Sequence, residues 1–442
     1  MHTRFLLPLF ILGLSVIACK DAAYDPSLTA NTSLIHRSVE KTTEIIVTDI
    51  FSPVVAGRIY AYSNIALYET LRQGSKDYLS LAGQIKDLAQ VPEPPADVKV
   101  DLNLAGLHAY TSVAKALIFS EQEMEDYRTA MYDDLKAKGL PEEIFTASIA
   151  YGQAVADHIL AWSKKDNYAQ TRSFPKYAVN KELGRWQPTP PAYIEAVEPH
   201  WRKIRALTLD SASQFKPLPP TPFSTDTNSL FYKQANDVYK AIETDSAAKM
   251  DIANFWDCNP YVMHQQGHLM MATKKITPGG HWMGIVGLAT RKAGSDMIGT
   301  AEAYVMVSIG LFDGFISCWD EKYRNNLVRP ETYINRFIDP DWEPKLQTPP
   351  FPEHTSGHSV ISSASSVIMT KLFGENFAFA DSSEVRYNLP VRQFNSFKDA
   401  AAEAAISRFY GGIHYMPAIE YGVVQGTHVG NHVLSKVHTR AK

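Results

Sequence analysis

Apolar residues recur with the period of an α-helix along most of the chain, and this pattern limits the fold more than any other feature. Runs that alternate between apolar and polar residues, as strands do, are scarce. We therefore predict an all-α fold of helical bundles joined by proline-rich loops. The expected helices span 54–73, 101–118, 120–137, 142–164, 227–256, 282–292, 298–328, 356–373, 396–410 and 417–436.

A segment dense in proline, 185–223, is the main interruption of this pattern, and a shorter one follows at 340–352. Proline lacks a backbone donor and blocks the continuation of a helix. The first segment is expected to separate the helices into two groups. We place the N-terminal half at 36–250, with this segment inside it, and the C-terminal half at 251–442.

The N-terminus is typical of a targeting segment. Arg4 precedes an apolar stretch over 5–17 that is too short to span a membrane comfortably. The stretch ends in Val-Ile-Ala-Cys at 16–19, which resembles a bacterial lipobox. This predicts a lipoprotein signal peptide over 1–18, a lipid anchor on Cys19, a tether over 19–35 and a place in the bacterial cell envelope, in the periplasm or on the outer-membrane surface. An ordinary signal peptide is the alternative, and no other stretch is expected to cross a membrane.

Charge and cysteine content narrow the classes of partner. The net charge is −4 and no run of Lys or Arg indicates nucleic-acid binding, although a few converging cations could still bind a small anion. The mature chain would keep Cys258 and Cys318, which could form one disulfide in an oxidising compartment. Their spacing is not that of a metal-binding cluster.

Three short segments in the C-terminal half carry residues suited to an oxyanion. The first holds Lys322 and Arg329 followed by Pro330. Seven residues are two helical turns, so both cations would lie on one face of a helix. We expect Pro330 to end this helix. Alone, such a pair is usually just a solvated helix face.

The second segment is Ser356-Gly357-His358 at the expected start of a helix, where a hydroxyl and free N–H groups favour an anion. Alone, it is more often a helix cap beside a surface histidine. The third segment holds Arg408 and His414 on either side of a glycine pair that breaks the preceding helix. This break would let both side chains approach one point.

Taken in this order, Lys-x6-Arg-Pro, Ser-Gly-His and Ser-Arg-x5-His resemble the motif of the superfamily that contains the type 2 phosphatidic acid phosphatases and the vanadium-dependent haloperoxidases. The resemblance covers about 93 residues. It implies a vanadate or phosphate site made of Lys322, Arg329, Ser356, Gly357, His358, Arg408 and His414.

The resemblance leaves two reactions open. In a phosphatase, His414 would form a phosphohistidine and His358 would protonate the leaving group. In a haloperoxidase, His414 would be the only protein ligand of vanadium, His358 would assist peroxide binding as acid and base, and Lys322 would polarise the bound peroxide. A non-catalytic surface lipoprotein that binds an anion or a partner is a third hypothesis.

The chain departs from the superfamily pattern at two positions. Thr355 replaces the usual proline before Ser-Gly-His, and Ala418 stands where an aspartate commonly orients the reactive histidine. The second departure weakens the phosphatase hypothesis, because a nucleophilic histidine benefits from such a partner. Glu420 or a backbone carbonyl could substitute.

Aromatic residues near the motif favour the haloperoxidase. Trp319 and Phe351 are similar to residues that line the halide side of the cofactor in fungal-type chloroperoxidases, although core packing would also explain them. His354 could be a second acid and base or merely exposed. The chain most resembles the vanadium iodoperoxidases of Bacteroidetes, and Tyr261 is a further candidate for the halide pocket. We therefore predict a haloperoxidase that uses hydrogen peroxide and halide, with iodide favoured and bromide a second possibility, and make no prediction of its oligomeric state.

Overall fold

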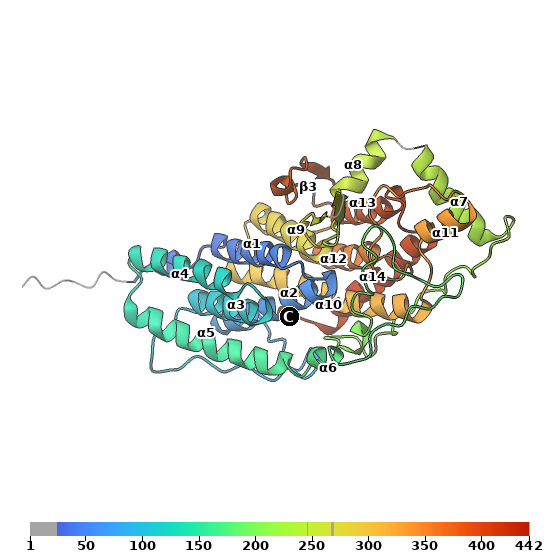
Figure 1. Ribbon diagram of the computed structural model, residues 1–442. Helices are drawn as coiled ribbons and strands as arrows, with labels where there is room; N and C mark the ends of the chain where they lie inside the picture. Colours follow the sequence, from blue (N-terminus) through green and yellow to red (C-terminus); the bar gives the residue numbers. More distant parts are fainter. Residues whose placement is uncertain (1–23, 245, 267–268, 442) are drawn as a thin grey trace, which may run out of the picture.

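The computed structural model describes residues 24–244, 246–266 and 269–441, and helices dominate them (Figure 1), which confirms the all-α prediction. The α-helices are α1 Ser33–Thr48, α2 Pro53–Leu71, α3 Leu102–Leu117, α4 Glu121–Ala137, α5 Glu142–Ser163, α6 Tyr168–Thr171, α7 Leu230–Glu243, α8 Ala247–Phe255, α9 Pro278–Ala293, α10 Met297–Asn325, α11 Pro330–Phe337, α12 Gly357–Phe373, α13 Phe397–Tyr410 and α14 Met416–Lys436.

Two short antiparallel strand pairs accompany the helices. β1 Met263–Gln266 pairs with β2 Leu269–Ala272, and β3 Phe379–Asp381 pairs with β4 Arg392–Phe394. Each pair forms a separate two-stranded sheet. They are local additions to a helical scaffold.

The central helices α2 and α10 are buried over most of their length. Every residue of α2 is buried, and α10 is buried without a break from Thr300 to Lys322. A helix that is apolar on all sides belongs in the core of a large protein. α2 packs against α3 and α10, whereas α10 also packs against α12 and α14. In Figure 1 the N-terminal helices α3, α4 and α5 accordingly lie at one end and the C-terminal helices at the other.

One continuous apolar core joins both halves of the chain, because the same cluster of buried residues runs from Leu34 to Val437. The predicted halves, 36–250 and 251–442, share this core. The C-terminal helices α12 and α14 approach so closely that a Cβ on Gly426 would lie 2.0 Å from the carbonyl oxygen of Val360. Glycine is therefore required at that crossing.

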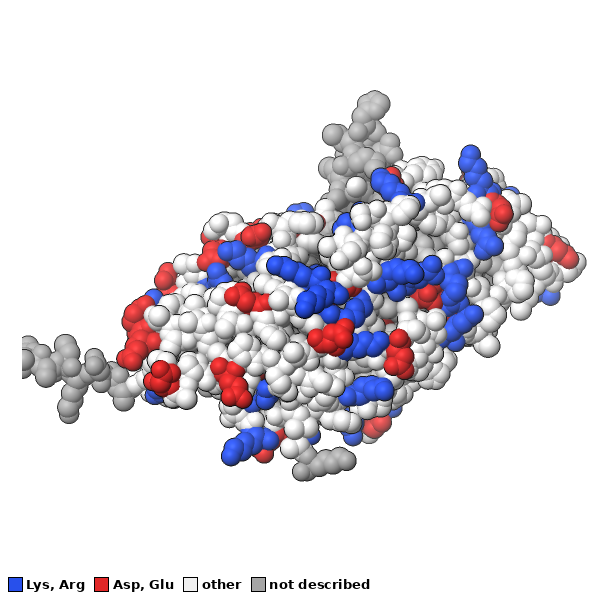
Figure 2. Space-filling view, turned by 90° about the horizontal axis from the view of Figure 1, so that it is seen from below, with Lys and Arg blue, Asp and Glu red and all other residues white. Residues whose placement is uncertain are grey.

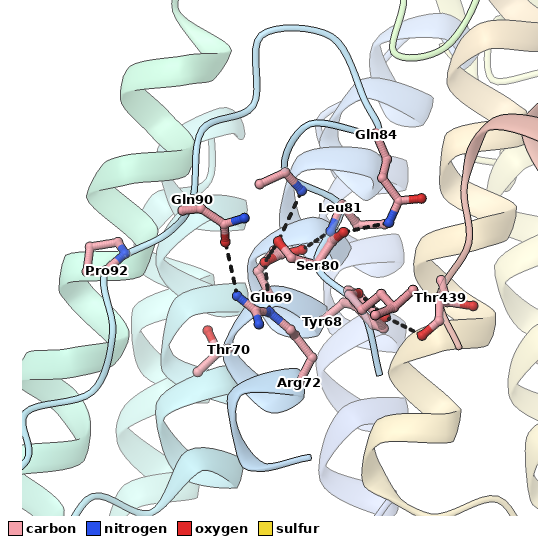
Figure 3. Close-up of polar contacts among 12 residues, drawn as sticks. Tyr68, Glu69, Thr70, Arg72, Ser80, Leu81, Gln84, Gln90, Pro92 and Thr439 are labelled. Atoms are coloured by element: carbon pink, nitrogen blue, oxygen red, sulfur yellow. Dashed lines mark hydrogen bonds and ion pairs between the residues drawn. The ribbon is translucent and has the colours of Figure 1, made fainter. Parts of the chain in front are cut away.

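A buried carboxylate fixes the loop that follows α2 (Figure 3). Glu69 accepts hydrogen bonds from Leu81 N at 2.6 Å and from Ser80 Oγ at 2.8 Å, and it pairs with Arg72 Nε at 3.2 Å. The neighbouring Tyr68 hydroxyl lies 3.2 Å from the carbonyl oxygen of Thr439. The end of α2 thus holds both its own loop and the C-terminal segment.

Several expected helix boundaries differ from those observed. The helix expected over 227–256 is two helices, α7 and α8, and α9 begins at Pro278, earlier than the expected residue 282, because Thr277 caps it. Helix α1 was not expected. Because α1 begins at Ser33 and Leu34 and Ile35 are buried, the expected tether does not extend to residue 35.

The predicted signal peptide over 1–18 and the lipidation site Cys19 lie outside the described residues. The expectation that no other stretch is long and apolar enough to cross a membrane is wrong, because α10 has both the length and the apolar composition. Its most apolar window is, however, entirely buried inside the protein.

Candidate oxyanion and halide site

The segment with Lys322 and Arg329 bends between its two cations. Helix α10 ends at Asn325, and Asn326 takes the left-handed conformation with φ of 52°. Arg329 then precedes α11, whose first residue is Pro330. The expectation of one helix ended by Pro330 is therefore wrong. Asparagine tolerates positive φ and ends α10, whereas the fixed φ of proline suits the first turn of α11.

Lys322 is fully buried and holds the loop that leads into the second motif segment. Its Nζ donates to the carbonyl oxygens of Pro352 at 3.0 Å, Glu353 at 3.1 Å and Thr355 at 2.5 Å. An ammonium group has three donors, and all three meet carbonyls here. Burial is the main cause that lowers the pKa of Lys322 to about 7.

Arg329 joins the first segment to His414 of the third. Its Nη1 lies 3.1 Å from His414 Nε2 and 2.8 Å from the carbonyl oxygen of Ile413, and its Nε donates to the carbonyl oxygen of Phe351 at 2.9 Å. A guanidinium group only donates, so Nε2 of His414 must be the acceptor. His414 therefore keeps an unprotonated Nε2.

Glu353 orients the same ring from the other side. His414 Nδ1 donates to Glu353 Oε1 at 2.8 Å, and Tyr415 N donates to the same oxygen at 3.0 Å. Burial raises the pKa of Glu353 to about 7, against the opposing effect of Arg329 and Lys322. Burial is also the largest cause that lowers the pKa of His414 well below its ordinary value, so the ring is neutral at neutral pH.

The partner of His414 was not found from the sequence. The suggestion that Glu420 fills this role is wrong, because Glu420 is exposed. Ala418 contributes only its carbonyl oxygen, which accepts from Ser356 N at 2.9 Å. The only sign of this partner in the sequence is an acidic residue, Glu353, five residues before His358. Its presence removes the argument that a missing aspartate disfavours a phosphatase.

The Ser-Gly-His segment begins α12 as predicted. Ser356 is the N-cap, and its Oγ accepts from Ser359 N at 3.3 Å, which leaves the hydroxyl proton free to donate. A Cβ on Gly357 would lie 3.8 Å from Trp319 Cζ3, so the backbone here runs beside the indole. The helix N-terminus adds a field that favours an anion.

His358 and Arg408 meet at the carbonyl oxygen of Trp256. Nε2 of His358 lies 3.0 Å from this oxygen and 3.1 Å from Arg408 Nη1, and Arg408 Nη1 donates to the same oxygen at 2.9 Å. When unprotonated, Nε2 can accept from the guanidinium, and when protonated it can donate to the carbonyl. Both protonation states of Nε2 thus have a partner in place. Burial, followed by Arg408, lowers the pKa of His358 well below its ordinary value.

The three cations of the motif are buried, unlike the mixed acidic and basic side chains on the face shown in Figure 2. Lys322 and Arg329 are 0 % exposed and Arg408 is 1 % exposed. Among the described residues, Nη2 of Arg329 and both Nε and Nη2 of Arg408 have no hydrogen-bond partner. Buried charged donors are costly without acceptors, so these groups favour an anionic ligand.

A cavity of about 30 Å³ lies between the second and third motif segments. Its lining brings the predicted halide residues next to the predicted oxyanion residues: Tyr261, Trp319, Phe351, Gly357, His358, Arg408 and His414. Lys322, Arg329 and Ser356 do not line it directly and lie behind these residues. His354 is also outside the lining and is buried, so the suggestion that it is exposed is wrong.

Aromatic side chains form one wall of the cavity. The rings of Trp319 and Phe351 are 4.9 Å apart between centroids, and Trp319 Nε1 donates to the carbonyl oxygen of Val197 at 3.2 Å. Val197 of the proline-rich segment 185–223 therefore contacts this aromatic wall. Tyr261 lines both this cavity and a larger groove of about 570 Å³, which places it between the inner site and the surface.

The two cysteines do not form a disulfide. Both thiols are free and buried, with Cys258 beside His281 and Cys318 beside Thr355.

The donor set of the cavity fits vanadate. Nε2 of His414 carries a lone pair, because Nδ1 carries the proton that Glu353 accepts, and this lone pair would pass from Arg329 Nη1 to the ligand on binding. The unpartnered N–H groups of Arg329 and Arg408 are suited to the oxygens of a tetrahedral or trigonal-bipyramidal oxyanion. The same donors would accept phosphate, so the fit concerns the shape and charge of the ligand.

Comparisons with known proteins agree with this description. The family model of the second helical-bundle domain of VCPO matches residues 335–442. A crystal structure described as the first bacterial vanadium-dependent iodoperoxidase is 50% identical, with a TM-score of 0.90, and the alignment covers 96% of this chain and 100% of that one. No curated protein matches the chain in a sequence search.

More distant structures share the fold. The holo form of a bacterial vanadium-dependent chloroperoxidase is 17% identical with a TM-score of 0.66, over 88% of this chain and 93% of that one. Its apo form is 18% identical with a TM-score of 0.67, over 87% and 94%. Half-identity to the iodoperoxidase over nearly the whole chain, together with the motif geometry, is decisive: the chain belongs to the vanadium-dependent haloperoxidase family.

Proposed function

We propose that this protein is a vanadate-dependent haloperoxidase that oxidises iodide with hydrogen peroxide to hypoiodous acid. The balanced reaction consumes iodide, hydrogen peroxide and a proton and releases hypoiodous acid and water. The 50% identity to a protein described as an iodoperoxidase supports this proposal.

The orientation of His414 is the observation that carries the proposal. Its Nε2 carries the lone pair of a neutral ring fixed by Glu353, and His414 lines a small cavity together with Trp319 and Phe351. This lone pair accepts from Arg329 Nη1 and would become available once Arg329 binds the oxyanion. The aromatic wall of this cavity suits a polarisable anion beside a bound oxyanion. A phosphate ester would also need room for its organic group.

Vanadate, when bound, would supply a Lewis-acidic centre that activates hydrogen peroxide toward halide. His414 Nε2 would hold it, and the free N–H groups of Arg329 and Arg408 would bind its oxygens. The free hydroxyl proton of Ser356 and the N–H of Gly357 would complete the donor set. Lys322 would add positive charge from behind while it fixes the loop through Pro352 to Thr355.

His358 would take up the proton that hydrogen peroxide gives up on binding. The His358 ring is neutral at neutral pH because its pKa is well below the ordinary value, and in the tautomer with the proton on Nδ1 its Nε2 can accept a proton. Once protonated, Nε2 would donate to the carbonyl oxygen of Trp256, 3.0 Å away, and could later return the proton to the leaving oxygen.

We assign the halide preference to the aromatic wall. Trp319, Phe351 and Tyr261 offer apolar, polarisable surface, which favours a large and weakly hydrated halide. Iodide is also the easiest of these halides to oxidise. Bromide is the expected second substrate.

One set of parallel assays tests the proposal. Iodide oxidation, bromide oxidation and hydrolysis of a generic phosphomonoester are measured on apoprotein with and without added vanadate. We expect iodide oxidation only after vanadate is added. Folded, vanadate-loaded protein that oxidises no halide contradicts the proposal, and ester hydrolysis that vanadate inhibits would identify a phosphatase instead.

Histidine variants localise the activity. His414→Ala should abolish vanadate retention, measured by equilibrium dialysis, whereas His358→Ala should retain vanadate and lose turnover. His428→Ala is a matched control because His428 is exposed on α14. We further propose that Cys19 anchors the enzyme in the cell envelope, which membrane fractionation of the wild type and of Cys19→Ser would test.

A further inference from the structure

A second group of chemically reactive side chains lies behind the wall of the oxyanion cavity. Cys258 follows α8, His281 lies in the first turn of α9, and Glu384 follows β3. They are 2 %, 0 % and 4 % exposed. Cys258 Sγ lies 3.5 Å from His281 Nδ1, which lies 3.0 Å from Glu384 Oε1, and the three potential ligand atoms are all within 4.8 Å of one another.

An outer carboxylate orients the histidine of this group. His281 Nε2 lies 2.8 Å from Asp381 Oδ2, while Asp381 Oδ1 accepts from Ser383 N at 3.0 Å and from Ser383 Oγ at 2.6 Å. A histidine that binds a metal almost always donates its other ring N–H to such a partner. With Nε2 bound to Asp381, the lone pair of Nδ1 can face Cys258 and Glu384.

The carboxylate of Glu384 provides an independent indication of a ligand. Among the described residues its Oε1 has no hydrogen-bond partner, although it is buried and only 3.0 Å from His281 Nδ1. The separation is short, but the geometry is not that of a hydrogen bond. A protonated His281 ring compensates part of the charge of this buried carboxylate, and a divalent cation between the two atoms would bind the oxygen directly.

We propose that Cys258, His281 and Glu384 bind a divalent cation that accepts sulfur and nitrogen ligands, with Zn²⁺ the best match, and that Asp381 supports the site from outside. With bond lengths of about 2.3 Å to sulfur and about 2.1 Å to nitrogen or oxygen, tetrahedral ligands lie roughly 3.4–3.6 Å apart. The observed 3.5 Å and 3.0 Å separations need only a small adjustment to reach this geometry. A water or the second oxygen of Glu384 would take the fourth position.

The net charge of the group is the same before and after a divalent cation replaces two protons. With a thiol, an imidazolium and the carboxylates of Asp381 and Glu384, the group carries +1 − 2 = −1. With Zn²⁺, a thiolate, a neutral imidazole and the same carboxylates it carries +2 − 3 = −1. Binding the cation therefore releases two protons, one from Cys258 and one from His281 Nδ1. No oxidation or reduction is involved.

The site would stabilise the back of the oxyanion cavity. The ring of Trp256 stacks on His281 at 4.3 Å between centroids with an interplanar angle of 15°. The carbonyl oxygen of Trp256 is the group shared by His358 and Arg408, and Cys258 itself lines the cavity. A cation on Cys258 and His281 would hold the segment 256–258 in place. The metal site does not depend on the proposed reaction.

Metal analysis of the full chain, expressed with zinc and dialysed without chelator before any vanadate is added, tests the proposal. We expect one zinc per chain by elemental analysis. When Co²⁺ replaces zinc, a thiolate-to-cobalt charge-transfer band should appear in the near ultraviolet. Folded wild-type protein with little zinc and no such band overturns the proposal, and the group would then hold only a shared proton.

Variants distinguish this site from adventitious binding. Cys258→Ser should remove the charge-transfer band, whereas Cys318→Ser, which alters the other buried thiol, should retain it. Asp381→Asn should keep the band and weaken Zn²⁺ binding by about 10- to 100-fold. Zinc that binds equally well to wild type and to Cys258→Ser contradicts the assignment. If a variant fails to fold, the wild-type metal content and cobalt spectrum still decide.

Discussion

Replacing Glu353 with Gln isolates the effect of its charge on His414. Glu and Gln side chains have nearly the same size. The Oε1 atom of either residue can accept from His414 Nδ1, 2.8 Å away, and from Tyr415 N, 3.0 Å away. A hydrogen bond to a charged group contributes about 1.5–3 kcal/mol, against about 0.5–1.5 kcal/mol for a neutral one. The bond that orients His414 should therefore lose about 1–1.5 kcal/mol.

This loss should appear in vanadate affinity. A difference of about 1.4 kcal/mol is tenfold in an equilibrium constant, so Glu353→Gln should raise the vanadate Kd about tenfold. Changes in groups that support a metal ligand typically cost 10- to 100-fold, which is consistent with this magnitude. Because the pKa of Glu353 is about 7, the Kd is measured at about pH 8, where the carboxylate is charged, by equilibrium dialysis of apoprotein against vanadate. The kcat for iodide oxidation is measured at the same pH and at saturating vanadate.

The two measurements separate positioning from a general loss of structure. If Glu353 acts by orienting His414, excess vanadate should restore most of kcat in Glu353→Gln. Glu420→Gln, which alters an exposed carboxylate six residues after the same histidine in the sequence, should leave the Kd unchanged. A folded Glu353→Gln protein with wild-type vanadate affinity refutes the orienting role.

Three further predictions concern catalysis, packing and pH. His358→Ala should lower kcat by about 10²- to 10⁴-fold at saturating vanadate, the usual contribution of a general acid or base, as steady-state kinetics would show. Gly426→Ala places a Cβ 2.0 Å from the carbonyl oxygen of Val360, so thermal denaturation should show a loss of about 1–3 kcal/mol or more, whereas Val424→Ala at an exposed position of the same helix should cost little. Burial lowers the pKa of His36 from 6.5 to about 4, so the unfolded chain binds the proton more readily and the free energy of unfolding should fall as pH drops from 6.5 to about 4. By pH 5 this loss is about 2 kcal/mol, and denaturant titrations of His36→Gln should show a smaller one.

The convergence of the motif could be predicted because each segment has a local cause. Ser356 caps a helix, and the break after Tyr410 lets Arg408 and His414 approach one cavity, as expected. The helical periodicity likewise located α2, α3, α4, α5, α12, α13 and α14 within a few residues.

What the sequence did not predict depends on contacts between distant segments. Glu353 stands before the motif and gains its role only because the loop returns to His414. Cys258 and His281 are separated by 23 residues and Glu384 by a further 103, so no spacing rule could group them. Asn326, which ends α10, was overlooked because a nearby proline is the stronger and here misleading boundary.

The buried cations of the motif have a consequence for the apoprotein in the cell. Lys322, Arg329 and Arg408 each lower the pKa of His414, so all three cations lie close enough to the same ring to repel one another. Glu353 is a buried acidic group near two of them. Any oxyanion that occupies the cavity should therefore also favour the folded state, by about 2.7 kcal/mol at a concentration of 100 Kd. Free phosphate, which has the same shape, should therefore stabilise the folded apoprotein until vanadate replaces it.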